Sequence, residues 1–295
     1  MNDISVTDTA FTGFRVVRAH FRALPLWTLL AIILALVVNA GFVATGVKVP
    51  DAEFLQQNPS QAPVFLAHLA PFILFAAIVG LIANGVIYAA MNRAVLRPAD
   101  SRWGYVRMGG AELRQMGLLL LLAAIFFGVY LGLMIAAILV GILFALAGKI
   151  AGVIAGAMAV ATLICALVVL AVRLSLASAE TFDSGRIRLG GSWALTRGRF
   201  WPILGAYVLA TALTAVVVLL AWLVELGLGA AVTGGHLQAF VSGSPQTLGA
   251  LFAPISLLRT ALGGFVSALI WPLFLTPAAA IYRVLAPTPA GSASW

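Results

Sequence analysis

Residues 117–172 read GLLLLLAAIFFGVYLGLMIAAILVGILFALAGKIAGVIAGAMAVATLICALVVLAV, and Lys149 is the only charged residue among them. As one continuous helix this stretch would be about 84 Å long at 1.5 Å per residue. The hydrocarbon core of a bilayer is only about 30 Å thick, and about 20 apolar residues cross it. The chain must therefore turn, and Gly148-Lys149 is the only polar interruption. We predict two membrane-spanning helices, 117–146 and 150–172, joined by a tight turn.

The rest of the chain is similarly apolar. Hydrophobic residues make up 63% of its 295 residues, charged residues make up only 9%, and the mean hydropathy is +1.10. Soluble globular domains average about 45–50% apolar and about 25% charged residues. We therefore predict one integral membrane domain over residues 1–295, an all-α polytopic membrane helix bundle with six transmembrane helices arranged as three hairpins. The six spans are predicted at 24–46, 64–91, 117–146, 150–172, 201–224 and 260–282, and a short interfacial helix is expected at 247–258.

The basic residues are unevenly distributed between the spans. Of the 17 Lys and Arg residues, all but Lys48, Lys149 and Arg259 fall in the N-terminal arm, in every second gap and in the C-terminal tail. Cytoplasmic loops of membrane proteins carry such an excess of Lys and Arg. We therefore predict a multi-pass protein of the bacterial inner membrane with both termini in the cytoplasm. The exoplasmic connections are then predicted at 47–63, 148–149 and 231–247.

The net charge of +8 does not indicate a nucleic-acid partner, because no soluble basic domain is present to carry one. Basic residues at the cytoplasmic edge instead predict contact with the anionic lipid headgroups of the phospholipid bilayer. The segments 11–24, 102–114 and 186–201 combine aromatic and basic residues, as amphipathic interfacial helices do. Their arginines are candidate contacts for headgroups or for a protein partner, although ordinary anchoring at the membrane surface is the simpler interpretation. These candidates are Arg15, Arg18, Arg22, Arg107, Arg114, Arg186, Arg188, Arg197 and Arg199.

Short similar motifs recur at the predicted cytoplasmic edge. The motif VRMGG at 106–110 resembles IRLGG at 187–191, and RAVLRP at 93–98 resembles RVLAP at 283–287. Their positions predict three similar units, each with a basic segment followed by a two-span hairpin. Because each unit holds two spans, all three have the same orientation, unlike the inverted repeats of many secondary transporters. The predicted units are 8–98, 99–175 and 184–287.

Four polar residues in or near the spans are candidate functional groups: Glu225, Asn39, Asn84 and His68. A charge at the bilayer centre costs about 2.5–3.5 kcal/mol on insertion scales. Glu225 is expected near the exoplasmic boundary, either as an interfacial carboxylate or as an ion- or proton-coupled site. We expect the two asparagines to form hydrogen bonds across helices and His68 to face water.

Small residues recur at four-residue spacing after the turn, at Gly148, Gly152 and Gly156. Such a pattern predicts close helix approach, either within the bundle or between the protomers of a homo-oligomer.

Motifs of catalysis are missing from the sequence. It holds no phosphate-binding Gly loop, no HExxH-type zinc motif and no nucleophile elbow. The single cysteine, Cys165, can form neither an intramolecular disulfide nor a thiol metal site. We therefore expect no enzymatic activity, no cofactor and no metal.

Residues 93–114 (RAVLRPADSRWGYVRMGGAELR) and 192–200 (SWALTRGRF) resemble a group of bacterial multi-span inner-membrane proteins. This group includes the membrane domain of glycerophosphoryl diester phosphodiesterases. In that family the phosphodiesterase chemistry belongs to a separate soluble barrel domain, whose acidic and His metal ligands this sequence does not contain. The resemblance implies a membrane domain without the enzyme, and no catalytic residue carries over.

Two functions remain open from the sequence. The first is a non-catalytic integral membrane protein that acts as a lipid- or protein-interacting scaffold or accessory domain. The alternative is a small transporter or lipid-handling permease. A permease predicts a polar cavity that reaches the middle of the bilayer and is lined by Asn39, Asn84 or Glu225, whereas solid packing of Leu, Ala and Gly would contradict it.

Overall fold

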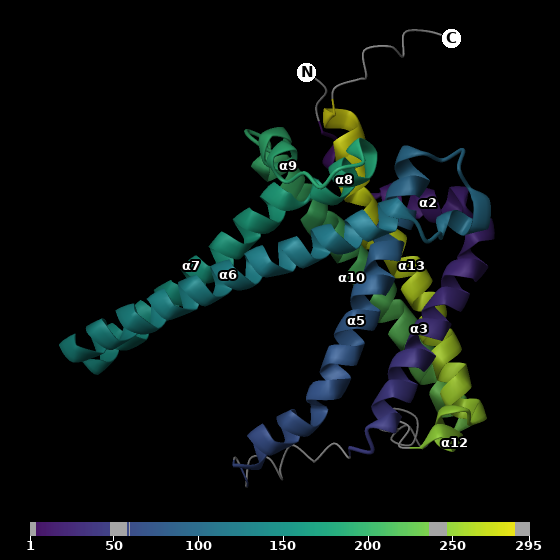
Figure 1. Cartoon of the computed structure of the whole chain (residues 1–295), viewed down its shortest axis with the longest axis horizontal. Coiled ribbons are helices and arrows are strands. Elements are labelled where there is room, and N and C mark those ends of the chain that lie inside the picture. The colour runs from purple at the N-terminus through teal and green to yellow at the C-terminus, as the bar shows by residue number, and fades with distance from the viewer. Residues whose placement is uncertain (1–3, 48–57, 59, 236–246, 287–295) are drawn as a thin grey trace.

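The computed structural model describes residues 4–47, 58, 60–235 and 247–286, and every regular element in these ranges is helical (Figure 1). Six helices are long and apolar enough to cross a membrane, so the chain is a multi-pass membrane protein of the all-α class. The prediction of six spans is confirmed. These helices are α3 (Leu24–Ala44), α5 (Gln61–Leu96), α6 (Gly110–Ala147), α7 (Lys149–Leu174), α10 (Phe200–Val232) and α13 (Pro254–Leu285).

Short helices gather at one end of the molecule. We call it the arginine end, because α2, α8, α9 and the last turns of α13 lie there, and the opposite end, near α12, the far end (Figure 1). The short elements are α1 (Val6–Ala10), α2 (Thr12–Ala19), η1 (Phe21–Ala23), η2 (Arg102–Tyr105), α8 (Ala177–Ser184), α9 (Gly190–Leu195) and α12 (Leu248–Leu251).

The predicted interfacial helices are shorter than expected. The segment 11–24 is helical except for a break at His20, whereas 102–114 contains only η2 and the start of α6. In 186–201 the helix α9 ends at Leu195, before the last arginines of the segment. The predicted helix at 247–258 is wrong, because Pro254 already begins α13 and only α12 precedes it.

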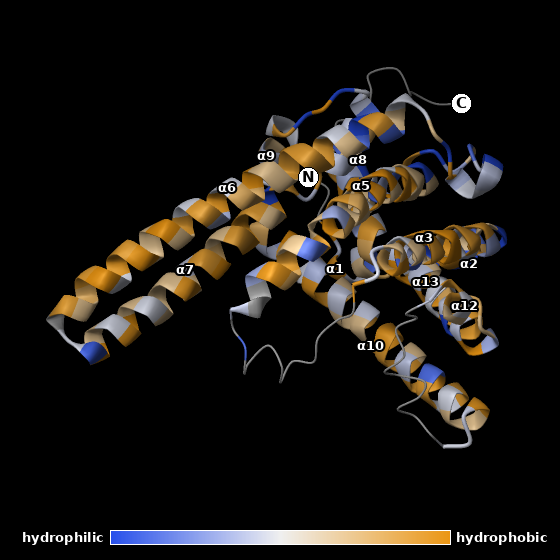
Figure 2. Cartoon of the chain, turned by 60° about the horizontal axis from the view of Figure 1, so that its bottom comes forward, coloured by the Kyte–Doolittle hydropathy of each residue, from blue (hydrophilic) through white to orange (hydrophobic). Residues whose placement is uncertain are grey.

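The tight turn between α6 and α7 is confirmed. Gly148 has a φ of +142°, a backbone conformation that residues with a Cβ rarely adopt. A Cβ on Gly152 would lie only 3.2 Å from the Ala145 Cα, so the two helices approach closely beside the turn. Gly156 faces nothing within 4 Å. Close approach through these glycines is therefore limited to the tip of the hairpin. Figures 1 and 2 show the hairpin projecting away from the other helices.

Helix pairs that follow each other in sequence differ in how closely they pack. The neighbour along most of α3 is α13, whereas α5 packs chiefly between α6 and α13. Gly264 permits the close approach of α13 to α3, because a Cβ there would lie 3.2 Å from the Thr28 carbonyl oxygen. Near the arginine end, α10 and α13 meet through Ile203, Ala206 and Ile281, which are all fully buried. The three-unit repeat stays a prediction.

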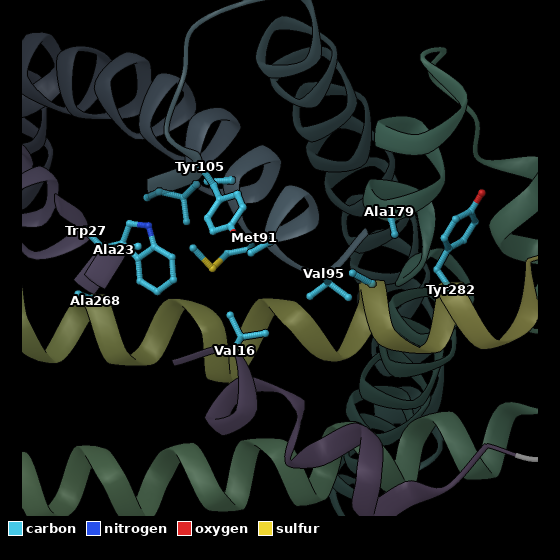
Figure 3. Packing of buried hydrophobic residues seen from close by; sticks show 13 residues of the cluster. Val16, Ala23, Trp27, Met91, Val95, Tyr105, Ala179, Ala268 and Tyr282 are labelled. Carbon is cyan, nitrogen blue, oxygen red and sulfur yellow. The ribbon is translucent and has the colours of Figure 1, made fainter. Parts of the chain in front are cut away.

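The main hydrophobic cluster lies toward the arginine end. Trp27 of α3, Met91 of α5 and Tyr105 of η2 are each 1% exposed and lie beside Val16 of α2 and Ala268 of α13 (Figure 3). Many large apolar residues of the spans are exposed in the isolated chain, Leu146 at the tip of α6 being 82% exposed. The arginine end therefore holds the helices together, and the rest of the spans offers its side chains to lipid.

A buried ion pair crosses this end. The Arg93 Nη2 atom lies 2.6 Å from the Glu112 Oε1 atom, and the two side chains are 7% and 2% exposed. Arg93 also donates to the Tyr105 carbonyl oxygen, and its guanidinium lies 5.4 Å from the ring centroid of Phe182. One side chain of α5 thus binds α6, η2 and α8.

The η2 turn has an unusual backbone. Trp103, Gly104 and Tyr105 have φ angles of 53°, 60° and 68°, a left-handed conformation that costs about 1–2 kcal/mol for each residue with a Cβ. The Trp27 Nε1 atom donates to the Gly104 carbonyl oxygen at 2.7 Å, and the Tyr105 hydroxyl donates to that of Pro98 at 3.0 Å. Together with Arg93, these bonds hold the turn in place.

We predict that Glu112→Gln will lower the free energy of unfolding by about 3 kcal/mol, because it removes the closer counter-charge of the buried Arg93. The remaining carboxylate is that of the partly exposed Asp100, whose Oδ2 atom lies 3.9 Å from the Arg93 Nε atom. Unfolding of the detergent-solubilised protein, followed by circular dichroism, measures this change. Asp8→Asn, which removes the exposed pair with Arg15, is the control and should have little effect. Equal stabilities of the two variants would contradict a structural role for the buried pair.

Candidate functional site

One face of the far half of α13 consists of small and polar residues. Ser256, Thr260, Gly263 and Ser267 follow one another at spacings of four, three and four residues, which places them on one side of the helix. Arg259 lies beside them on the same side. A stripe of this composition is unusual in a helix that crosses hydrocarbon, where exposed positions are ordinarily apolar.

This stripe forms the floor of a cavity of about 360 Å³. Ala31, Ala35 and Asn39 line it from α3, again at helical spacing. Glu225 lines it from α10, and Leu251 of α12 lines it toward the far end. Because α3 and α10 both pack on α13, the cavity is a groove between α3 and α10 along α13. We call it the polar groove.

An ion pair spans the polar groove. The Arg259 Nε atom lies 3.5 Å from the Glu225 Oε1 atom, and the side chains are 41% and 29% exposed. The partly exposed Glu225 keeps hydrogen-bonding capacity for a third group, since a carboxylate accepts several hydrogen bonds. The groove thus presents both signs of charge to whatever enters it.

The other polar side chains of the groove are bonded to their own helices. The Asn39 Nδ2 atom donates to the Ala35 carbonyl oxygen, and Thr260 and Ser267 donate to the carbonyl oxygens of Ser256 and Gly263, each at 2.8 Å. The hydroxyl donors of Thr260 and Ser267 are used, the Asn39 amide keeps one N–H donor, and the oxygens of all three can still accept. The expected bond from Asn39 across helices is therefore wrong.

The depth of the groove in the bilayer follows from the number of residues along α13. Ser267 lies 13 residues after the start of α13, which is about 20 Å along the helix axis. From Arg259 the distance to Ser267 is eight residues, about 12 Å along the axis, which is close to the half-thickness of a hydrocarbon core of about 30 Å. Glu225 itself lies seven residues before the end of α10. The pair is therefore near the far boundary, and the Ser267 end of the groove is deep.

Two of the four predicted intramembrane residues lie elsewhere. Asn84 and His68 are exposed on α5 and bind their own helix, Asn84 through the Gly80 carbonyl oxygen and His68 through that of Val64, each at 2.7 Å. The prediction that Asn84 bonds across helices is wrong. Asn39 and Glu225 are the two that the fold brings together.

Sequence reasoning missed Arg259. The sixth span was predicted to begin at residue 260, so Arg259 was counted as a loop residue, whereas α13 begins at Pro254 and places it inside the helix. Its spacing from Thr260, Gly263 and Ser267 could have indicated that it lies on the same face of one helix.

The predicted headgroup arginines do not form one cluster. Arg15 and Arg107 pair with Asp8 and Asp100, and the Arg107 guanidinium holds the pKa of Asp100 below its usual value. The Nε atom of Arg114 is buried without a hydrogen-bond partner in the described chain. Arg199 is half-buried. The exposed arginines among these candidates are Arg15, Arg18, Arg22, Arg186, Arg188 and Arg197.

Exposed aromatic rings accompany some of these arginines. Trp103 is 77% exposed, Phe21 is 63% exposed, and Arg22 lies 5.9 Å from the Phe21 ring centroid. Together with His20 they border a shallow cavity of about 540 Å³ between η1 and η2. Aromatic and basic side chains in this combination are typical of the membrane–water interface.

No metal-binding cluster in the described ranges and no known relative indicates a different site. Over the described ranges, no group of three or more His, Cys, Asp or Glu side chains could hold a metal ion. No protein-family model, curated protein or solved structure matches the chain. The polar groove is therefore the candidate site on its geometry alone.

We predict that the polar groove admits water from the far end. In a Cys165→Ser background, Thr260→Cys and Ser267→Cys should react with a charged, membrane-impermeant thiol reagent about tenfold faster than Val216→Cys, which is exposed on α10 outside the groove. A thiol in hydrocarbon has a raised pKa and little reactive thiolate. Equally slow reaction at all three positions would show that the groove is closed.

Proposed function

We propose that the chain is a non-catalytic integral protein of the bacterial inner membrane that handles lipid. The polar groove carries this proposal, because it holds a charged pair and acceptor oxygens within the apolar part of the fold. This geometry favours the permease alternative over a scaffold whose helices pack solidly. The proposed lack of catalysis rests on the missing motifs and on the resemblance to a membrane domain.

A lipid fits the groove better than a small soluble solute does. The floor residue Gly263 is exposed, so the groove is open along its side. In a bilayer that side faces acyl chains. An amphipathic molecule can then enter sideways, with its polar part at the ion pair and its chains in the surrounding hydrocarbon.

The groove also fits a headgroup that carries both charges. A phosphate oxygen would accept from the Arg259 guanidinium, and an ammonium group would donate to the Glu225 carboxylate. Phosphatidylethanolamine, which carries both groups, is therefore the probe of choice.

A second function is favoured at the arginine end. Exposed Arg22 lies beside the Phe21 ring, and exposed Arg197 precedes the 75% exposed Trp201 by four residues, so both segments combine charge with interfacial aromatic rings. We propose that this end lies at the cytoplasmic surface and contacts anionic lipid headgroups. A cytoplasmic protein partner would use the same side chains.

The lipid proposal predicts that the detergent-purified protein retains phosphatidylethanolamine when it is examined by native mass spectrometry. Glu225→Gln and Arg259→Gln should each lower the retained fraction by about fivefold, the factor that corresponds to about 1 kcal/mol. Asn84→Ala, which alters an exposed polar side chain outside the groove, is the matched control. If wild type retains no lipid, or if all the variants retain as much as wild type, the groove is not a lipid site.

The proposed orientation predicts the result of reporter fusions. Fusions after positions 105 and 185 should report the cytoplasm, and fusions after positions 55 and 240 the exoplasmic side, because the excess of arginine stays inside. A single reversed result among the four would contradict the six-span topology in the proposed orientation.

A further inference from the structure

A second cavity lies toward the arginine end, between the root of the α6–α7 hairpin and the other spans. Its volume is about 370 Å³, within the range of about 300–1,000 Å³ that small-molecule sites occupy. Residues of α5, α6, α7, α8, α10 and α13 line it, and Figure 1 shows that α6 and α7 diverge from the other spans beyond this point. We call it the inner cavity.

The inner cavity is mostly apolar. Phe126, Val168, Leu204 and Phe274 contribute side chains from four different spans. No Asp, Glu, Lys or Arg is among its lining residues. An ionised ligand group would therefore have no counter-charge there, and an uncharged ligand is favoured.

Two tyrosines line this apolar space, and neither phenol hydroxyl forms a hydrogen bond within the described part of the chain. Tyr88 comes from α5 and Tyr207 from α10, and the two groups are close enough to interact electrostatically. The Tyr207 hydroxyl is buried and forms no hydrogen bond in the described chain. Ser175 is the polar side chain beside it, and the Ser175 hydroxyl donates to the Val172 carbonyl oxygen at 2.8 Å, while its oxygen can still accept. Buried polar groups ordinarily have partners, so an unpaired hydroxyl at a cavity wall points to an absent acceptor.

The neighbouring polar side chains differ, because they are already bonded to one another. The Asn92 Nδ2 atom donates to the Ser178 Oγ atom at 2.8 Å, and Ser178 donates to the Gln115 Oε1 atom at 2.9 Å. These bonds tie α5, α6 and α8 together at one wall of the cavity. The two phenols therefore remain as the hydroxyl donors that a ligand can use, beside the second N–H of Asn92.

The depth of Tyr207 also restricts the ligand. Tyr207 lies six residues after Trp201, which is about 9 Å further along the axis of α10. Trp201 is 75% exposed, in the position of an interfacial tryptophan. A ligand at Tyr207 is thus already within hydrocarbon.

We propose that the inner cavity binds an uncharged hydrophobic molecule through a carbonyl oxygen, which accepts hydrogen bonds from Tyr207 and Tyr88. Its hydrocarbon part lies against Phe126, Leu204 and Phe274. The carbonyl belongs to a neutral ester lipid or to a quinone, since both combine such an oxygen with a long hydrocarbon chain. This site is separate from the polar groove and does not depend on the function proposed for it.

The test uses a diacylglycerol that carries a photoreactive diazirine on one acyl chain, incubated with the full chain in lipid nanodiscs. Mass spectrometry of the irradiated protein should place the label on the cavity-lining parts of α6, α10 and α13. Unlabelled diacylglycerol should compete, whereas hexadecane, which lacks a carbonyl, should not. Competition by an uncharged quinone that exceeds that of diacylglycerol would identify the quinone as the source of the carbonyl.

Variants separate recognition from simple partitioning. Tyr207→Phe removes only the hydroxyl and should lower labelling by about threefold or more. Tyr88→Phe should act in the same direction. Tyr130→Phe is the matched control, because Tyr130 lies on α6 outside the cavity and is 41% exposed.

Two results would overturn the proposal. One is labelling spread over lipid-facing residues such as Met158 and unchanged in Tyr207→Phe; the other is competition by hexadecane as strong as that by diacylglycerol. Thermal unfolding of the ligand-free Tyr207→Phe protein shows whether the variant is still folded. Because the variant removes an unpaired buried hydroxyl, its unfolding temperature should equal or exceed that of wild type.

Discussion

The pair formed by Arg93 and Glu112 organises the arginine end because both charges have left water. A buried guanidinium is tolerated only when its donors are used and a counter-charge is close. Glu112, the Tyr105 carbonyl oxygen and the Phe182 ring meet these needs from α6, η2 and α8. The same contacts hold η2 in its left-handed conformation. Four elements are thus fixed relative to one another by the solvation requirement of one side chain.

Away from this end the helices pack much less tightly, and both cavities lie in these loosely packed regions. Lipid tails are as apolar as leucine, so a spanning helix gains little by burying its apolar side chains against another helix. The structure can therefore leave space along α13 at modest cost. The polar groove lies between α3 and α10, and the inner cavity lies where the α6–α7 hairpin leaves the other spans. Tight packing at one end permits open sites along the rest.

Hydrophobic length and glycine were sufficient to predict the spans and the turn at Gly148, because both depend on local composition. The contacts between distant segments were not predictable in this way. Arg93 and Glu112 form an ion pair across the irregular segment between α5 and α6. Hydrophobic periodicity within a helix does not predict such a contact. Asn39 and Asn84 bond to carbonyl groups four residues back in their own helices, which satisfies an amide without any neighbour. Arg259 was missed because the predicted span boundary was six residues late.

The α6–α7 hairpin has a mechanical consequence. With 38 residues, α6 is about 57 Å long, and packing against other spans is confined to the portion near its root. A long rigid element fixed at one end acts as a lever. A rotation of about 5° at the root carries the Gly148 tip through about 5 Å, on the helix length that follows from the rise per residue. The bonds of Gln115 to Ser178 lie at the root of this lever, so a small change of angle there would be amplified at the Gly148 tip.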